Sequence, residues 1–354
     1  MNYSKQVSRW QPDKVADQIA DAIYQSCFLQ DEFTICSINV MICNTTIILS
    51  GQLRTTADVD IDSVVETTCK RLNVSLEKIL NFITDVSKEI VDCSENFTYP
   101  TESCIIRGYA SSDSRSRLIP SAHFANKVMR EYQKIVEDSE NFHGDANVIV
   151  KVNDYNPYLL EQVILSVNHS PKLLIDDVRA ILYRRLSQKI NANTWVINAA
   201  DTWLFGGTTN FVGVSGRKSI LDNYGSELGN DVALSGKDIF NVKRLATYAS
   251  RKIAVDYVNK NSDAQNLNKA FCDIELTYQI HEKYPIYVRG FLCTASQNKA
   301  PDYKDISEEI GKNYDLSIQG MRKLLGDVRK INFVNLSSGC HFYNNYFGAT
   351  HERF

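Results

Sequence analysis

An acidic stripe near the start of the chain is the first group of residues that could do chemistry. Gln11-Pro12-Asp13-Lys14 opens an expected helix, and Asp17 and Asp21 follow Asp13 at intervals of four residues. A carboxylate and an ammonium group at a helix N-terminus can hold a metal ion and a phosphate together. The same pattern fits a capped helix with a solvated acidic face, and the residues alone favour that plainer interpretation.

Two glycine-containing segments carry positive charge. Gly206-Gly207 precedes the stretch 213–218 (GVSGRK), and glycines beside adjacent Arg217 and Lys218 are typical of loops that bind an anion. Residues 235–238 (SGKD) resemble the end of a phosphate-binding loop, but the spacing from Gly229 is wrong and Asp238 replaces the metal-binding hydroxyl. We therefore reject a P-loop and expect a site for a small polyanion.

Other chemistries are not indicated. The histidines do not stand at metal-ligand spacing, and the sequence has no G-x-S-x-G motif or C-x-x-C pair. Gly108-Tyr109-Ala110 and the Ser-, Arg- and Asp-rich stretch that ends at Pro120 are expected to form an exposed loop.

The elements that must position these segments occur three times in the same order. A helix at 13–28, strands at 33–43 and 46–53 and a helix at 60–72 form the first set. The order returns at 121–138, 147–153, 159–167 and 173–190, and again at 243–259, 272–280 and 285–293 with helical segments between 304 and 326. One such unit covers one face of a small sheet, so three are expected to pack together. We predict an α/β (α+β) protein of three helix–hairpin–helix modules, an N-terminal module (1–110), a central module (111–203) and a C-terminal module (204–354).

Composition limits the possible partners and compartment. The 354 residues carry a formal net charge of −3, which argues against a nucleic-acid binder held by phosphate contacts. The sequence has no apolar run long enough for a membrane span and no signal-peptide pattern at its start. Nine irregularly spaced cysteines are typical of reduced thiols, so a cytoplasmic protein is expected.

The motifs together resemble the S-adenosylmethionine synthetase family, in the same order and over nearly the whole chain. Residues 11–19 (QPDKVADQI) are similar to HPDKIADQI, and 206–218 are similar to GGPQGDAGLTGRK. Gly51-Gln52 and the later residues 57–60 (ADVD) resemble the family's GE…AAVD stretch. Residues 222–225 (DNYG) resemble DTYGG, residues 235–238 (SGKD) resemble the family's SGKD, and residues 313–316 (NYDL) resemble NFDL. The resemblance implies three modules around a pseudo-threefold axis and a homodimer with active sites at its interface. It also implies attack of methionine sulfur on C5′ of ATP, followed by cleavage of the released triphosphate.

Several positions would then keep the family's roles. The resemblance makes Asp13 a Mg²⁺ ligand and Lys14 a phosphate contact, and it places a nucleoside contact at Glu102. The residues expected around the triphosphate are Arg217, Lys218, Lys237 and Asp238.

Other positions depart from the family. Gln11 stands where the family has its catalytic histidine; its amide can donate a hydrogen bond but cannot carry a positive charge by taking up a proton. Gln52 replaces a methionine-contacting glutamate, Phe211 an aspartate, and Lys243 a metal-binding aspartate. Arg9 and Asn39 also replace glutamates, so the K⁺ site is expected to be lost, while Asn147 and Asn241 replace basic residues. Lys243 and Lys218 are expected to take part in catalysis by neutralising phosphate.

These substitutions leave three hypotheses. The favoured one is an ATP-using enzyme whose second substrate is not free L-methionine, acting by adenosyl transfer or by ATP-driven ligation. The loss of two recognition carboxylates supports it, since each charge-assisted hydrogen bond contributes roughly 10–100-fold in binding. The alternatives are a compensated, ordinary S-adenosylmethionine synthetase and a non-catalytic nucleotide-binding paralogue or subunit. The oligomer is expected to be a homodimer, with a tetramer or hetero-oligomer left open.

Overall fold

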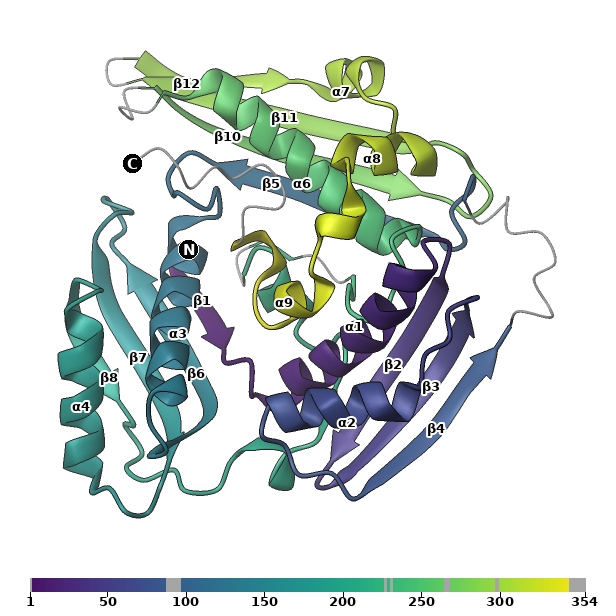
Figure 1. The fold of residues 1–354 in the computed structure, drawn as a ribbon. Helices are drawn as coiled ribbons and strands as arrows, with labels where there is room; N and C mark the ends of the chain where they lie inside the picture. The colour runs from purple at the N-terminus through teal and green to yellow at the C-terminus, as the bar shows by residue number, and fades with distance from the viewer. Residues whose placement is uncertain are drawn as a thin grey trace.

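The computed structural model describes residues 2–86, 97–225, 228–229, 232–263, 268–296 and 299–343. Three four-stranded sheets surround a centre that contains helices α1 (Pro12–Gln30), α3 (Pro120–Glu137) and α6 (Val242–Asn261), as Figure 1 shows. The short helix α9 (Phe333–Ser337) lies between them and contacts α1. The expected arrangement of three similar modules is therefore confirmed.

The first two modules share one topology. In the first, β2 (Ile35–Cys43) and β3 (Thr46–Arg54) form a hairpin, and α2 (Ile61–Arg71) leads to β4 (Lys78–Asp85), which pairs parallel to β3. In the central module, the same order is β6 (Phe142–Val152), β7 (Leu160–His169), α4 (Ile175–Ser187) and β8 (Ala192–Ile197).

The third module differs after its hairpin. The hairpin of β10 (Asn268–Tyr278) and β11 (Tyr287–Ser296) continues directly into β12 (Lys299–Asp305), which pairs antiparallel to β11. The helices α7 (Ser307–Asn313) and α8 (Ile318–Leu325) follow the sheet instead of crossing between two of its strands. The expected helical segments between 304 and 326 are present, whereas β12 is an additional strand.

Each sheet is completed by a strand from another part of the chain. The strand β1 (Tyr3–Val7) pairs with β6 of the central sheet, β5 (Cys104–Ser111) pairs with β10 of the third, and β9 (Gly213–Val214) pairs with β2 of the first. These strands precede α1, α3 and α6 in the chain, so the strand before each long helix pairs with a sheet other than the one that contains the hairpin after that helix. The module boundaries at 110/111 and 203/204 remain a prediction. The three exchanged strands connect sheets that lie on different sides of these boundaries.

The expectation of an exposed loop at 108–120 is wrong. Gly108-Tyr109-Ala110 belongs to β5, and the following serines are largely covered. Arg251 of α6 explains this burial, because its guanidinium donates to the carbonyl oxygens of Ser116 (2.6 Å) and Arg117 (2.9 Å). A stretch rich in Ser and Arg is polar in sequence, but here its backbone satisfies a buried cation.

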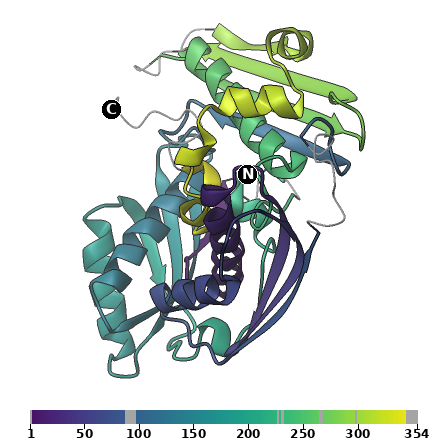
Figure 2. The same cartoon turned by 45° about the vertical axis from the view of Figure 1, so that its right-hand side comes forward.

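The helices cover one face of each sheet and leave the other face open. Along β10 the residues Ala270, Cys272, Ile274, Leu276 and Tyr278 are buried at every second position, which is the period of a strand with one covered face. Figure 2 shows β2–β4 with α1 and α2 on one side of the sheet. The first and third modules share a continuous apolar core, and the central module has its own.

Within the described ranges, no helix is both long and apolar enough to cross a membrane. Parts of the stretches 74–106 and 226–234 lie outside the described residues.

We predict that Gly108→Ala lowers the free energy of unfolding by about 2 kcal/mol or more. A Cβ at Gly108 would lie 2.5 Å from the backbone of Ser250, so β5 and α6 would have to separate. Gly311→Ala is the matched control, since no atom lies within 4 Å of its added Cβ and alanine favours helix α7 by roughly 1 kcal/mol. Chemical denaturation of the two variants should give shifts of opposite sign; equal shifts would contradict the packing argument.

Candidate active site

The acidic stripe of α1 is buried, so the interpretation of it as a solvated face is wrong. Asp13, Asp17 and Asp21 accept hydrogen bonds from the backbone N–H groups of Val214 (2.9 Å), Gly216 (2.7 Å) and Gly236 (2.9 Å), respectively. The three carboxylates are at most 1% exposed. One helix face therefore fixes both glycine loops, 213–218 and 235–238, and with them the cations that these loops carry.

Lys14 does not reach the surface. Its side chain is fully buried, and its ammonium group is paired with Asp17 at 2.9 Å and with Asp222. Burial opposes the charge, but these two carboxylates outweigh it and raise the pKa of Lys14. The expected contact between Lys14 and a phosphate is therefore not available in this structure. Lys14 instead joins α1 to the short helix α5 (Ser219–Asp222).

The first basic cluster consists of Arg217 and Lys218 around Asp13. Lys218 donates to Asp13 Oδ2, and the Arg217 guanidinium lies 3.6 Å from Asp13 Oδ1 with its side chain 57% exposed. Burial would raise the pKa of Asp13, but Lys218 and the Val214 amide outweigh burial and lower it. The cluster thus presents one exposed and one partly exposed cation beside an ionised carboxylate.

Gln11 is the N-cap of α1. Its side-chain oxygen accepts from the backbone N–H groups of Asp13 (2.9 Å) and Lys14 (3.3 Å), and its amide nitrogen donates to Asp13 Oδ2 at 3.2 Å. Capping uses the oxygen of Gln11, so only an amide hydrogen is left for an added ligand.

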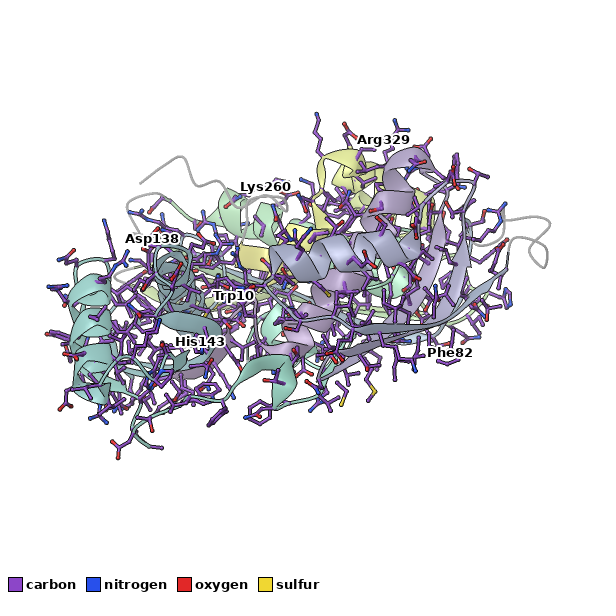
Figure 3. The ribbon with its side chains drawn as sticks, turned by 60° about the horizontal axis from the view of Figure 1, so that its bottom comes forward. Trp10, Phe82, Asp138, His143, Lys260 and Arg329 are labelled. Atoms are coloured by element: carbon purple, nitrogen blue, oxygen red, sulfur yellow. The ribbon has the colours of Figure 1, made fainter. Side chains whose placement is uncertain are left out.

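Arg9 does not add charge to this cluster, because it pairs with Glu137 at 2.8 Å and lies over the ring of Trp10. Gly144 packs directly on that ring, so the start of α1 meets the start of β6 there. Figure 3 labels Trp10, which makes this contact, and His143, the residue before Gly144.

Asp145, just after that contact, was not expected from the sequence. It is 4% exposed and accepts the backbone N–H of Gly207 at 2.7 Å, which connects the Gly206-Gly207 segment to β6. Burial raises the pKa of Asp145 to about 6, the nearby Asp13 charge adds to this, and the Gly207 hydrogen bond opposes it. A lone aspartate at the start of a strand carries no sequence signal of such a role.

The second basic cluster lies where the first and third modules meet. Lys243, in the first turn of α6, pairs with Glu102 at 2.6 Å, and Lys237 is close enough to Glu102 and Lys243 for their charges to affect its pKa. Burial opposes the ionisation of Glu102, but Lys243 and Lys237 together lower its pKa. Glu102, Lys237 and Lys243, predicted separately, are thus brought together by the fold. Glu102 already has a cationic partner before any nucleoside binds.

Asp238 fixes the second loop through its carboxylate. It is 5% exposed and accepts from the backbone N–H groups of Cys36 (3.0 Å), Phe240 (2.8 Å) and Asn241 (2.8 Å). Asp238 therefore has a structural role, and its expected role as a binding residue stays a prediction.

Gln52 and Phe211, the expected substrate contacts, are exposed and lie on different segments. Gln52 is opposite Ser37 in the β2–β3 hairpin, and Ser37 in turn forms a β-bridge with Lys237, so Gln52 shares a row with the second cluster. Phe211 is 52% exposed and ends the turn that begins at Gly207, near the first cluster. Among the described residues the two clusters make no direct side-chain contact, and the acidic face of α1 connects the loops that carry them.

Two family models and a solved structure match the chain. The family model for the S-adenosylmethionine synthetase N-terminal domain matches residues 1–95, and the model for the C-terminal domain matches residues 205–353. Among solved structures, an unusual S-adenosylmethionine synthetase from Campylobacter jejuni has 18% sequence identity and a TM-score of 0.82, covering 97% of this chain and 96% of that one. These matches define the scaffold of an ATP-using adenosyltransferase family. The chain belongs to the S-adenosylmethionine synthetase family, as a divergent member.

The family uses ATP and Mg²⁺, but the described residues do not fit a resident metal ion. Both oxygens of Asp13 already accept hydrogen bonds from protein donors. In the described part of the chain, no three His, Cys, Asp or Glu side chains are grouped to hold a metal. Mg²⁺ usually keeps several waters and binds through substrate phosphates with one or two carboxylates. Any Mg²⁺ would therefore arrive with the phosphates, as part of the nucleotide substrate.

We predict that Asp145→Asn removes a pH-dependent loss of stability. The pKa of Asp145 is raised from 3.8 to about 6, so the protonated carboxyl contributes stability below pH of about 4 that is lost as the pH rises through 6. Asparagine keeps an acceptor for Gly207, so the variant should be more stable than the parent by about 3 kcal/mol at pH 8. Denaturant unfolding from pH 4 to 8 measures the difference. Asp176→Asn, at an exposed carboxylate, should follow the parent; a parallel curve for Asp145→Asn would contradict the assignment.

Proposed function

We propose that this protein transfers the adenosyl group of ATP to a second substrate other than free L-methionine. The observation that carries the proposal is the fixing of Arg217, Lys218 and Lys237 on two loops by one buried helix face. Loops held in this way present cations without reorganisation when an anion binds, and this favours a polyphosphate. The family's scaffold is kept, whereas the side chains expected to recognise methionine are changed.

Attack on C5′ forms a bond from the nucleophile to carbon and breaks the C5′–O bond, so the electron pair leaves on the triphosphate oxygen. The developing negative charge would be stabilised by Arg217, Lys218 and Lys237, and Lys243 adds an ammonium where the family has a carboxylate. Glu102 and Asp13 hold Lys243 and Lys218 in place before the nucleotide arrives. No residue needs to deprotonate a thioether nucleophile, so the loss of the histidine at Gln11 does not prevent this step.

The second substrate is inferred from what the exposed positions offer. Gln52 and Phe211 supply an amide and an aromatic ring where a zwitterionic amino acid would need a carboxylate for its ammonium group. A nucleophile without an α-ammonium group fits these residues better than methionine does.

We also propose a homodimer whose sites combine the first basic cluster of one chain with the second cluster of its partner. The open sheet faces support this, because they expose apolar side chains such as Met41, Phe82 and Phe291. The lack of direct contact between the two clusters within one chain also fits an interface site, in which each cluster faces the other cluster of the partner.

We predict that ATP is consumed with a thioether or other nucleophile lacking an α-ammonium group, and not with L-methionine. The protein should be incubated with ATP, Mg²⁺ and a substrate panel, and adenosylated products and released phosphates should be measured by mass spectrometry. S-adenosylmethionine formed from L-methionine at a comparable rate would show an ordinary synthetase. ATP binding without consumption across the whole panel would show a non-catalytic nucleotide-binding protein.

The interface site predicts the nucleotide stoichiometry of mixed dimers. Arg217→Gln and Lys243→Gln should each weaken ATP binding by about 10–100-fold, because each removes a charge-assisted contact. A heterodimer of the two variants, isolated with two different tags, should bind one ATP with parental affinity, since one of its two sites is intact. Calorimetry counts the sites. Lys260→Gln, an exposed change on the same helix as Lys243, should leave two sites per dimer. A heterodimer with no intact site would show that each site lies within one chain.

A further inference from the structure

A second cavity lies at the junction of the first and third modules and shares no lining residue with either basic cluster. Its volume is about 730 Å³, and it is bounded by the end of α1, the segment before α6, residues 97–98, and α8 with the turn that follows. This size is within the range of pockets for small organic ligands. None of the functions proposed above uses it.

One wall of the cavity is aromatic. The rings of Phe97 and Phe240 are 4.3 Å apart, and Phe33 lies 5.5 Å from Phe97 and nearly parallel to Phe240. Phe240 is buried, whereas Phe33 is 47% exposed on the cavity side of the cluster. An exposed phenyl ring next to two packed ones offers a stacking surface for a planar group.

The lining next to the aromatic wall is cationic. Arg322 lies over the Phe240 ring at 4.8 Å, and the exposed Lys323 and Arg329 line the same cavity. Arg329 is committed to Glu32 at 2.7 Å, but Arg322 approaches Glu32 only at 3.5 Å. The Arg322 Nε atom has no acceptor among the described residues. The Nε atom is itself buried, so an anion in the cavity would meet the terminal guanidinium group, whose pairing with Glu32 is long.

The charge balance of the lining favours an anion. Its cations are Arg322, Lys323 and Arg329, and its carboxylates are Glu32 and Asp327. Asp327 is turned to its own segment, because it accepts the Arg329 backbone N–H at 3.3 Å and pairs with Lys330 at 3.6 Å. An excess of one positive charge remains, and it lies beside the aromatic wall.

We propose that this cavity binds a planar aromatic molecule with one anionic group, the ring stacked on Phe33 and the anion held by Arg322 and Lys323. A ligand with a ring and no charge would leave these cations unpaired. A small inorganic anion would leave the exposed ring of Phe33 uncovered. The aromatic anion satisfies both walls together.

The cavity is separate from the first basic cluster. Figure 3 shows Arg329, at the cavity, and Trp10, next to the first cluster, well apart in the view. Phe240 belongs to the segment between Lys237 and Lys243, so a bound ligand would touch the segment that carries the second cluster.

The test is calorimetric or NMR titration of the full chain with two probes. Adenosine 5′-monophosphate represents a nucleotide source of the anion, and indole-3-acetate a simple aromatic carboxylate; inorganic phosphate and indole are the controls that lack the ring or the charge. We expect at least one probe to bind at submillimolar concentration and both controls to bind at least tenfold more weakly. Binding of only one probe identifies the source of the ligand.

Variants assign the binding to this cavity. Phe33→Leu should weaken probe binding about 2–10-fold, and Arg322→Gln about 10–100-fold. Lys323→Gln, at an exposed side chain, should weaken it in the same direction and provides the test if Arg322→Gln does not fold. Lys312→Gln is the matched control, since this exposed lysine of α7 pairs with the exposed Glu308 and neither residue is part of the lining.

Two results would overturn the proposal. One is the absence of binding by both probes at millimolar concentration. The other is binding that Lys218→Gln weakens and that Phe33→Leu and Lys323→Gln leave unchanged, because the probe would then occupy the first basic cluster. ATP binding measured on the same variants keeps this outcome distinct from a failure of the proposed adenosyl transfer.

Discussion

The capture of three backbone N–H groups by the acidic face of α1 is the interaction on which the site depends. Asp13, Asp17 and Asp21 are spaced one helical turn apart, and each holds a residue of a loop that leads into the third module. A hydrogen bond to a charged group contributes roughly 1.5–3 kcal/mol, and leaving such a charge buried without partners costs more than that. The buried carboxylates therefore need the N–H groups of the loops as hydrogen-bond partners, and the loops need the carboxylates to fix their conformation.

Because of this arrangement, the basic residues around α1 fall into two groups, one buried and one exposed to solvent. Lys14 and Arg244 are fully buried and neutralise the stripe from within, through Asp17, Asp222 and Asp21. Arg217, Lys218 and Lys237 lie on the loops themselves and keep some exposure to solvent. The buried pairs give the loops one conformation, and the exposed cations are the part of the network that can interact with phosphate.

The long helices and the three hairpins were predictable because their apolar periods are strong and local. The strands β4, β5, β8 and β12 were not, since each lies at the edge of its sheet, where a strand needs fewer apolar residues; β4, for example, has no fully buried residue. Glu102, Lys237 and Lys243 were each expected in the site, but their contact with one another was not, because it depends on the fold. Burial of Lys14 and Asp238 could not be predicted, because it depends on groups far away in the chain. Asp145 has no motif around it.

The exchange of β1, β5 and β9 among the sheets has a consequence for how the molecule holds together. The strand before α1 pairs with β6, the strand before α3 pairs with β10, and the strand before α6 pairs with β2, so the three sheets depend on one another in a closed ring. Removing any one sheet with its long helix and the strand before that helix would leave another sheet without its edge strand. The three units therefore resemble one another like separate domains but are stable only as a single cooperative body.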